Sequence, residues 1–407
     1  MLDSLSTSCY IEAELQNCKE CMYSRDMLLK IKGLANQYPV ITILGPRQAG
    51  KTTLAIAAFP DKPYVNLEEL DIQEAAILDP RKFLSNYPDG AILDEIQRAP
   101  KLLSYIQVIV DKKDTKGLFI LTGSHQVELH EAVSQSLAGR TALLNLFPMS
   151  LAEFEKNGIS LTLDEALLNG GYPRIFKDKL NPTEAYRNYF QTYVERDLRN
   201  LKQIKDLSTF QKFVRLCAGR VGGILNAESL AGDVGVSSKT IKEWISILEA
   251  SFILIRLQPY HENFGKRLIK APKLYFTDVG LAAYLLGIET TTQLARDPLR
   301  GNLVENLVLL ELFKSRLNKG KDPQLYYYRD SQGNEVDLIF QSGHELIPIE
   351  IKSGQTFTKE FLKNLTFFEK LTSPRSPQGY LIYAGPHEQM IGTVQIINYL
   401  KTATILP

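Results

Sequence analysis

The run GPRQAGKTT at residues 45–53 is the sequence feature that most constrains how this chain can fold. Gly45 and the triplet Gly50-Lys51-Thr52, separated by four residues, form the pattern of a phosphate-binding loop. Such a loop needs a strand before it and a helix after it, because backbone N–H groups and a helix N-terminus must both face the phosphates. The flanking runs YPVITILG (38–45) and KTTLAIAAF (51–59) predict that strand and that helix.

The loop supplies a complete set of groups for binding ATP. Its glycines allow backbone N–H groups to wrap the phosphates, and Lys51 is placed to pair with the β- and γ-phosphates. The Thr52 hydroxyl is the type of group that ligates Mg²⁺ in such sites. We therefore expect ATP and Mg²⁺ as cofactors, with the nucleotide bound by Gly45, Pro46, Arg47, Gln48, Ala49, Gly50, Lys51, Thr52 and Thr53.

The acidic pair that ends the run AILDE (91–95) predicts hydrolysis as well as binding. Asp94 follows three apolar residues at a strand end and is the expected second Mg²⁺ ligand, while Glu95 is placed to polarise the attacking water. Ser124 ends the next strand, GLFILTGS (117–124), and is a candidate for sensing the γ-phosphate, or else an ordinary turn residue. With YVNL (64–67), these runs predict four strands of a mostly parallel sheet.

Length and composition indicate several domains in a soluble chain. The 407 residues exceed the usual single domain, and 47 basic against 46 acidic residues give no overall polycationic character. No run reaches the ~20 apolar residues of a membrane span, and the N-terminus lacks a signal pattern. We expect a cytoplasmic protein without a membrane partner. Cys9, Cys18 and Cys21 cluster near the N-terminus, but they lack a fourth zinc ligand and receive no role.

The pattern of helices and strands predicts the α/β P-loop domain and further units after it. The expected fold is a P-loop NTPase parallel sheet with a helical lid, a winged-helix middle domain and a C-terminal α/β domain. The corresponding ranges are 1–22 for an N-terminal extension, 23–155 for the ATPase core, 156–204 for the lid, 205–287 for the winged helix and 296–407 for the last domain.

The middle segment has the pattern of a helix-turn-helix followed by a β-ribbon. A first helix is expected from about Leu230, a turn at Gly235, and a second helix over Ser238–Leu248. The outer face of the second helix carries Lys239 and Lys242. These lysines, and a basic wing formed by Lys266, Arg267, Lys270 and Lys273, predict contact with DNA. The alternative is a protein-protein module.

Acidic residues and a lysine on two successive strands mark the C-terminal domain. EVDLIF (335–340) contributes Asp337, and LIPIEIKS (346–353) contributes Glu350 and Lys352 on one strand face. Two carboxylates that hold a metal and a lysine that orients its bound water are typical of metal-dependent nucleases. Glu305, in an otherwise apolar helix, is a further candidate ligand.

Beyond its two nucleotide motifs, the chain resembles bacterial and archaeal AAA-type ATPases that carry a C-terminal domain of unknown function. The matching stretches are LTGS (121–124), LAGRTALLNLFPMSLAEF (137–154), GGYP (170–173) and YVERDL (193–198). The resemblance directs attention to Arg140 and Arg196, as arginine fingers in a homo-oligomer or as structural ion pairs. The last hundred residues resemble the PD-(D/E)XK restriction-endonuclease-like superfamily, although Asp337 follows Val336 instead of proline.

These observations predict an ATPase whose nucleotide state controls a DNA-binding middle domain and a metal-dependent, nuclease-like C-terminal domain. The first alternative is a nucleotide-dependent regulatory protein whose C-terminal domain binds a partner without cutting. The second alternative is an ATP-driven remodeller of polypeptides, which the absence of an aromatic pore loop disfavours.

Overall fold

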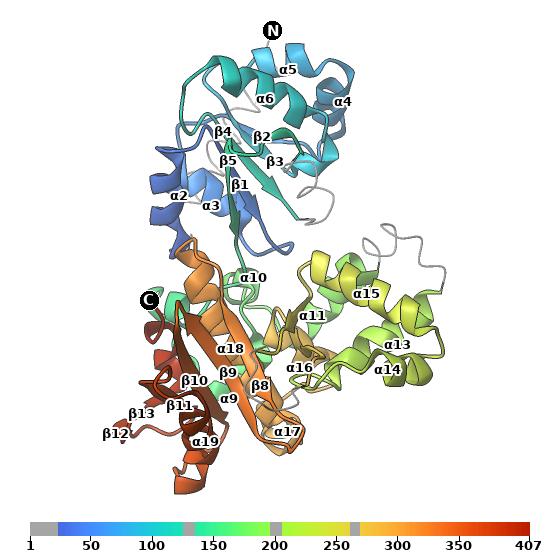
Figure 1. The fold of residues 1–407 in the computed structure, drawn as a ribbon. Coiled ribbons are helices and arrows are strands. Elements are labelled where there is room, and N and C mark those ends of the chain that lie inside the picture. Colours follow the sequence, from blue (N-terminus) through green and yellow to red (C-terminus); the bar gives the residue numbers. More distant parts are fainter. Residues whose placement is uncertain (1–22, 125–134, 196–205, 261–268) are drawn as a thin grey trace.

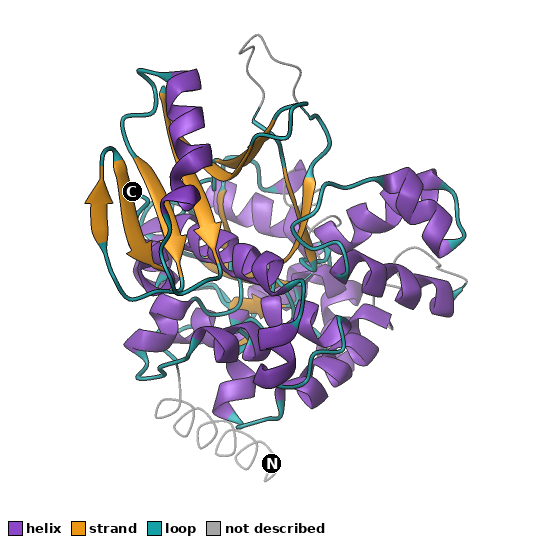
Figure 2. Cartoon of the chain, turned by 90° about the horizontal axis from the view of Figure 1, so that it is seen from below, coloured by secondary structure: helices purple, strands orange, loops and turns teal. Residues whose placement is uncertain are grey.

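The structure, a computed structural model, describes residues 23–124, 135–195, 206–260 and 269–407. Figure 1 shows a block built on one sheet in its upper part, a second sheet in its lower part, and helices α13 to α15 projecting to one side. Seen from below, the strands of the second sheet lie together beside the C-terminus, and helices fill the middle of the molecule (Figure 2).

The first sheet has five parallel strands in the order β2-β3-β4-β1-β5. The expected strands are confirmed, but the sequence interpretation missed β5, which pairs with β1 from Val40↔Thr141 onward. This edge strand alternates between buried and half-exposed residues, so its run TALLN lacks the continuous apolar signal of β1 and β4. The bounds are β1 Val40–Leu44, β2 Tyr64–Asn66, β3 Ile92–Asp94, β4 Phe119–Gly123 and β5 Thr141–Asn145.

Helices cover this sheet and place the two nucleotide motifs at its carboxyl edge. β1 leads into the loop before α3, and β3 ends at Asp94. Since parallel strands end at the same edge, the loop and the acidic pair lie together. The helices are α2 Met27–Ala35, α3 Lys51–Ala58, α4 Leu70–Leu78, α5 Pro80–Ser85 and α6 Leu102–Lys112, with a 3-10 turn η1 at Ile96–Arg98.

The following segment is helical, as predicted, and Gly170 and Gly171 interrupt it. Gly170 has φ 63°, a conformation that ends α9 and favours glycine. Pro173 then opens α10, a position where its missing N–H costs nothing. The elements are α8 Leu151–Lys156, α9 Leu163–Asn169, α10 Pro173–Lys177, α11 Pro182–Tyr189 and the π-helical turn η2 Phe190–Glu195.

The middle segment forms helices followed by a two-stranded antiparallel ribbon, β6 with β7. The first helix of the expected helix-turn-helix begins at Ala227, earlier than Leu230, because Asn226 caps it. In the second helix Ile241, Ile245 and Leu248 are buried as predicted. The elements are α13 Leu207–Ala218, α14 Ala227–Val234, α15 Ser238–Ala250, β6 Leu254–Leu257, β7 Lys273–Phe276, α16 Val279–Leu285 and α17 Thr291–Arg296.

The last segment is a long helix followed by a mixed six-stranded sheet in the order β12-β13-β11-β10-β9-β8. The helix and the strands expected from the sequence are confirmed, and the hairpin β12–β13 adds to one edge of the sheet. The elements are α18 Arg300–Asn318, β8 Leu325–Arg329, β9 Glu335–Ser342, β10 Glu345–Lys352, η3 Lys359–Leu362, α19 Lys363–Thr372, β11 Gly379–Tyr383, β12 Gln389–Ile391, β13 Val394–Asn398 and η4 Tyr399–Thr404.

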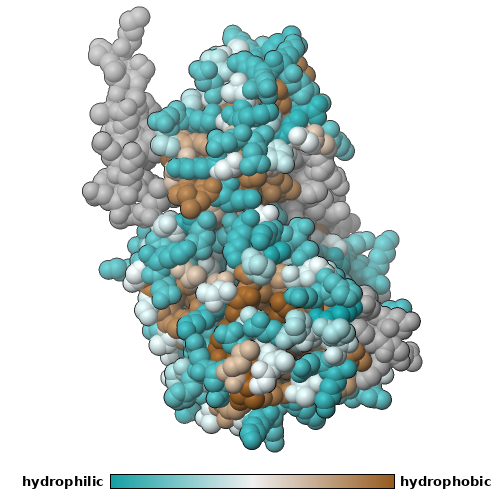
Figure 3. Space-filling model, turned by 60° about the vertical axis from the view of Figure 1, so that its left-hand side comes forward, coloured by the Kyte–Doolittle hydropathy of each residue, from teal (hydrophilic) through white to brown (hydrophobic). Residues whose placement is uncertain are grey.

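One hydrophobic core extends from Leu151 to Leu406 and includes residues of the helical segment α8–α11, the middle segment and the C-terminal sheet. α18 is buried along most of its length, and its Asn306 side chain bonds both the N–H and the C=O of Phe276 in β7, at 2.9 and 2.8 Å. On the face seen in Figure 3, hydrophilic residues cover most of the surface and hydrophobic residues gather in separate patches.

Candidate active site

The phosphate-binding loop is held in a shape that requires glycine at its first position. A side chain on Gly45 would place its Cβ 2.0 Å from the carbonyl oxygen of Leu146, the residue after β5. The backbone after β5 therefore packs directly against the start of the loop. Gly50 takes a left-handed conformation with φ 94° immediately before α3. The loop therefore presents its N–H groups and the N-terminus of α3 toward one cavity.

Lys51 folds back onto the loop. Its ammonium group donates to the carbonyl oxygens of Gly45 (3.0 Å) and Pro46 (2.9 Å), and the side chain is buried. Burial lowers the pKa of Lys51, and the nearby carboxylates of Glu95 and Asp94 oppose this shift. Phosphate oxygens would offer this ammonium stronger, charged acceptors than the two carbonyls.

Asp94 is the centre of a hydrogen-bond network at the end of β3. The Thr52 hydroxyl donates to its two carboxylate oxygens at 2.9 and 3.0 Å, so the two expected Mg²⁺ ligands lie together. Thr122 and Tyr64 also donate to this carboxylate. Burial raises the pKa of Asp94, and these hydroxyl donors oppose the increase. The sequence interpretation missed Tyr64 and Thr122, whose contacts depend on strand order.

Glu95 is oriented by two neighbours. It has φ 55°, and its carboxylate accepts hydrogen bonds from Ser124 (2.9 Å) and from Gln97. Burial favours a higher pKa for Glu95, but Lys51 and these donors outweigh it and lower the pKa. Glu95 is therefore a carboxylate held beside the loop lysine, and Ser124, the predicted γ-phosphate sensor, contacts this carboxylate.

Arg25, which no sequence pattern singled out, connects the loop to the segment after β5 through hydrogen bonds. Its guanidinium donates to the carbonyl oxygens of Ala49 (2.7 Å) and Phe147 (2.6 Å) and to Glu153 (3.0 Å). Both charged side chains are almost fully buried. A planar guanidinium suits this role because it donates in several fixed directions at once.

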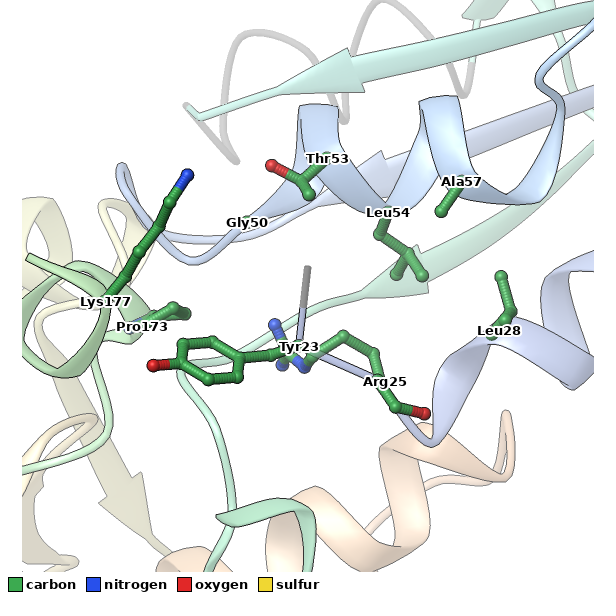
Figure 4. A pocket seen from close by; sticks show the side chains of 10 residues that line it. Tyr23, Arg25, Leu28, Gly50, Thr53, Leu54, Ala57, Pro173 and Lys177 are labelled. Carbon is green, nitrogen blue, oxygen red and sulfur yellow. The ribbon is translucent and has the colours of Figure 1, made fainter. Parts of the chain in front are cut away.

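Two cavities meet beside the loop, and α10 borders both. The first, of about 250 Å³, is largely apolar and lies between α2, α3 and α10; Figure 4 shows Leu54, Ala57 and Pro173 around it. The second, of about 530 Å³, contains Lys51, Thr52, Asp94 and Glu95. Gly50, Thr53, Pro173 and Lys177 line both cavities. An apolar pocket joined to a phosphate cradle fits the base and the phosphates of a nucleotide.

Arg174 and Lys177 of α10 bring positive charge to the second cavity, and the sequence interpretation missed both. Arg174 forms an ion pair with Asp178 at 3.0 Å. The preceding run GGYP (170–173) was interpreted as a helix break and as a stretch that resembles AAA-type ATPases, and the residues after it received no role.

Of the two arginine-finger candidates, Arg140 lies within the described residues. Arg140 forms a two-pronged ion pair with Asp111 of α6, at 2.6 and 2.9 Å. Its carbonyl accepts from the N–H of Val40, at the end of β1 opposite the phosphate loop. Any contact of Arg140 with a γ-phosphate would therefore have to be in a second copy. Arg196 lies outside the described residues, as do Cys9, Cys18 and Cys21.

Lys273 corrects one expectation for the middle segment. It was assigned to a basic wing, but its side chain is buried and pairs with Glu305 of α18 (2.9 Å) and Glu335 of β9. Tyr275, also in β7, donates to Glu305. Lys273 therefore pairs with acids of α18 and β9 and is not available to DNA. Lys270 is exposed, and Lys266 and Arg267 lie outside the described residues.

Asp337, Glu350 and Lys352 lie close together, as predicted. Lys352 donates to Glu350 at 2.6 Å, Asn364 donates to the same oxygen at 3.0 Å, and Asp337 accepts the N–H of Ile351 at 2.8 Å. Burial and the charge of Asp337 raise the pKa of Glu305 to about 7 and that of Glu350 to about 8. The three carboxylates are thus near enough to influence one another.

The arrangement of these carboxylates does not fit the expected metal site. Across the described ranges, no group of three or more His, Cys, Asp or Glu side chains is placed to hold a metal ion. The physical reason is that these oxygens already accept hydrogen bonds. Lys273 and Tyr275 donate to Glu305, and the Ile351 amide donates to Asp337. One oxygen of Glu350, Oε2, is buried without a hydrogen-bond partner among the described residues.

The described segments contain no helix with the length and apolarity that a bilayer crossing needs.

Family models match most of the chain. Residues 37–155 match an AAA domain. Residues 160–292 match a domain of unknown function (DUF8612), and residues 300–402 match another (DUF4143). The phosphate loop, Asp94, Glu95 and Ser124 all fall within the AAA match.

The chain is similar to proteins of bacteria and archaea. Uncharacterized protein Rv2008c of Mycobacterium tuberculosis is 31% identical over 335 residues, which cover 82% of this chain and 74% of that protein. Uncharacterized protein MJ1544 of Methanocaldococcus jannaschii is 24% identical over 371 residues, 82% of this chain and 79% of that protein. Among solved structures, the Walker-type ATPase PABY2304 of Pyrococcus abyssi is 17% identical, with a TM-score of 0.45 over 65% of this chain and 96% of that chain.

The raised pKa of Glu350, about 8, predicts a pH-dependent stability. Between its ordinary value of about 4.5 and 8, the folded state keeps a proton that the unfolded state releases, so stability falls as pH rises. One such group gives a slope of about 1.4 kcal/mol per pH unit. Thermal unfolding of metal-free protein from pH 5.5 to 8 should show a smaller decrease for Glu350→Gln than for wild type.

Glu388→Gln is the matched control for this measurement, because Glu388 lies in the same domain in an exposed ion pair with Lys401. It should keep the wild-type pH slope. Equal slopes for wild type and Glu350→Gln would show that Glu350 carries no proton in the folded state.

Proposed function

Because this chain belongs to the same family as the mycobacterial protein Rv2008c and carries an AAA domain, we propose that it is a Mg²⁺-dependent ATPase. The observation that carries the proposal is the contact between Thr52 and Asp94 at the mouth of the phosphate loop. It joins a hydroxyl and a carboxylate that suit Mg²⁺, beside a lysine that suits phosphate.

Each residue of the site has a proposed role. Lys51 leaves its carbonyl acceptors to pair with the β- and γ-phosphates, and Thr52 and Asp94 hold Mg²⁺. When bound, Mg²⁺ neutralises charge on the phosphate oxygens. Glu95 orients the attacking water, and Ser124 holds the Glu95 carboxylate in place from 2.9 Å away. Arg47 through Ala49 complete the backbone cradle.

α10 is proposed to bind the nucleotide from the lid side. Pro173 borders the apolar cavity that suits the adenine ring, and Arg174 and Lys177 face the cavity that suits the phosphates. Closure of such a lid excludes water and adds positive charge where negative charge is concentrated.

ATP binding and hydrolysis should respond separately to substitution at this site. Lys51→Ala should abolish binding of a fluorescent ATP analogue, whereas Glu95→Gln should bind it normally and lose hydrolysis by at least about 100-fold. Arg174→Ala with Lys177→Ala should weaken binding about tenfold through lost phosphate contacts. Lys116→Ala is the control, since Lys116 is paired with Asp114 before β4, at the opposite edge of the sheet. Retained binding in Lys51→Ala would overturn the assignment of the loop.

We propose that the middle segment binds DNA. Support comes from the two helices α14 and α15 joined by a short turn, from the β6–β7 ribbon, and from exposed Lys239 and Lys242 on α15. Such a winged-helix arrangement presents one helix face to the major groove. The same arrangement also serves protein recognition, which is the alternative.

DNA affinity should depend on salt through these two lysines. In Lys239→Ala/Lys242→Ala, affinity for a duplex should decrease, and the slope of log affinity against log salt should flatten by about 2, one for each lost phosphate contact. Fluorescence anisotropy over a salt series measures both quantities. Lys401→Ala, which removes an exposed lysine of the C-terminal domain, should leave the slope unchanged. Wild-type behaviour of the double variant would favour a protein partner for this face.

For the C-terminal domain we favour a platform that binds without cutting. Lys273 and Lys352 already bond Glu305, Glu335 and Glu350, and their ammonium groups occupy the positions where a metal would compete. The second candidate remains a metal-dependent nuclease. It is favoured by Oε2 of Glu350, which is buried without a hydrogen-bond partner among the described residues and lies beside Asp337 and Lys352.

Plasmid DNA distinguishes these two candidates. With ATP and either Mg²⁺ or Mn²⁺, the platform predicts that wild type leaves supercoiled plasmid intact on an agarose gel. Cleavage by wild type that Lys352→Ala and Glu350→Ala both abolish would instead establish the nuclease. Cleavage that persists in both variants would indicate a contaminating enzyme.

Assembly into a homo-oligomer also remains a proposal. Arg140 is on the surface, paired with Asp111, at the end of β1 opposite the loop. If Arg140 acts as a finger, it does so on the nucleotide of a second copy.

A further inference from the structure

α10 is too short to hold its own position over the nucleotide cavities. It spans only Pro173–Lys177, and isolated helices of this length are unstable in water. Its place must therefore be set by what precedes and surrounds it. The residues directly before it are Gly170, Gly171 and Tyr172.

A single buried carboxylate, that of Asp278, holds this turn. Its Oδ2 accepts the backbone N–H of Gly171 at 2.7 Å, and its Oδ1 accepts the hydroxyl of Tyr186 at 2.6 Å. Oδ1 also accepts the N–H of Leu281 and so caps α16. Asp278 is 1% exposed, and it lies 107 residues from Gly171 in the sequence. Charge-assisted hydrogen bonds that are shielded from water in this way are strong.

The two glycines before α10 leave no room for a side chain at either position. A Cβ on Gly170 would lie 2.3 Å from Oδ1 of Asp278 and 2.0 Å from the Tyr186 hydroxyl. A Cβ on Gly171 would lie 2.5 Å from the carbonyl oxygen of Met149, whose N–H donates to the Gly171 carbonyl at 2.8 Å. The Gly171 residue is thus held on one side by Asp278 and on the other by Met149.

Asp278 belongs to a segment that is anchored on the C-terminal domain. It follows β7, in which Lys273 and Tyr275 contact Glu305 and in which the backbone of Phe276 is bonded by Asn306. The carboxylate that holds the turn before α10 therefore follows a strand that α18 bonds directly.

We propose that Asp278 is a positioning residue of the ATP site. It touches no part of the nucleotide cavities that Pro173, Arg174 and Lys177 line, and it acts by fixing Gly171 and, through Gly171, the approach of α10. The inference rests on the proposed ATPase function, because it assigns Asp278 a role in that site.

Asp278→Asn tests the proposal, because it keeps the side-chain shape and replaces one acceptor oxygen by a donor that opposes the Gly171 or Tyr186 donors. We expect the dissociation constant for MgATP to rise about tenfold. We also expect amide hydrogen exchange of nucleotide-free protein to increase over residues 171–177. Asp206→Asn is the matched control, since Asp206 caps α13 in the same manner and is exposed.

A double-mutant cycle separates positioning from general destabilisation. If Asp278 acts through α10, Asp278→Asn should cause little further loss of affinity in the Arg174→Ala/Lys177→Ala background. A loss of the same size in both backgrounds would overturn the proposal. Tyr186→Phe, which removes one donor to the carboxylate, gives a milder version of the test if Asp278→Asn does not fold.

The outcomes distinguish this inference from the proposed function. Wild type that binds no ATP would refute the ATPase assignment and the inference together. Wild type that binds ATP, with unchanged affinity in Asp278→Asn, would refute the inference alone, even if exchange over 171–177 increased.

Discussion

The nucleotide site depends on the buried ion pair between Arg25 and Glu153. Burying two charges is costly unless further hydrogen bonds satisfy them, and both residues have such bonds. Arg25 bonds the carbonyls of Ala49 and Phe147, while Glu153 accepts the N–H groups of Asp26 and Ser150. The pair thereby ties the phosphate loop, the end of β5 and the start of α8 to one point. Because the guanidinium of Arg25 and the carboxylate of Glu153 both have these partners, they hold the loop against β5 and α8 without help from a nucleotide.

The sequence predicted those parts of the site that have a local sequence signal. The loop, Asp94 with Glu95, and Ser124 each end a strand, and strand ends of a parallel sheet meet at one edge. Arg25, Tyr64 and Arg174 could not be predicted in this way. Arg25 reaches Glu153 across 128 residues, and nothing near it in the sequence signals a buried partner. The edge strand β5 was missed because three of its five residues are not buried.

Lys273 shows why charge patterns mislead when the partner is unknown. Among its basic neighbours it has the pattern of a wing that contacts DNA, yet it is buried against Glu305 and Glu335. Strand alternation correctly placed Glu350 with Lys352, because that relation is local. The partner of Lys273 comes from a helix and a strand of the following domain, and only the fold brings them together.

The continuous core from Leu151 to Leu406 has a consequence for how this protein can change over time. Segments that share a core cannot be exchanged independently between relatives, because each segment contributes only one side of the packed surface. A middle segment taken from another family member would meet α18 with unmatched side chains, and Asn306 would lose the strand it bonds. Substitutions on the two sides of this core must therefore compensate for one another. We therefore expect residues 151–406 to change as a single unit among members of this family.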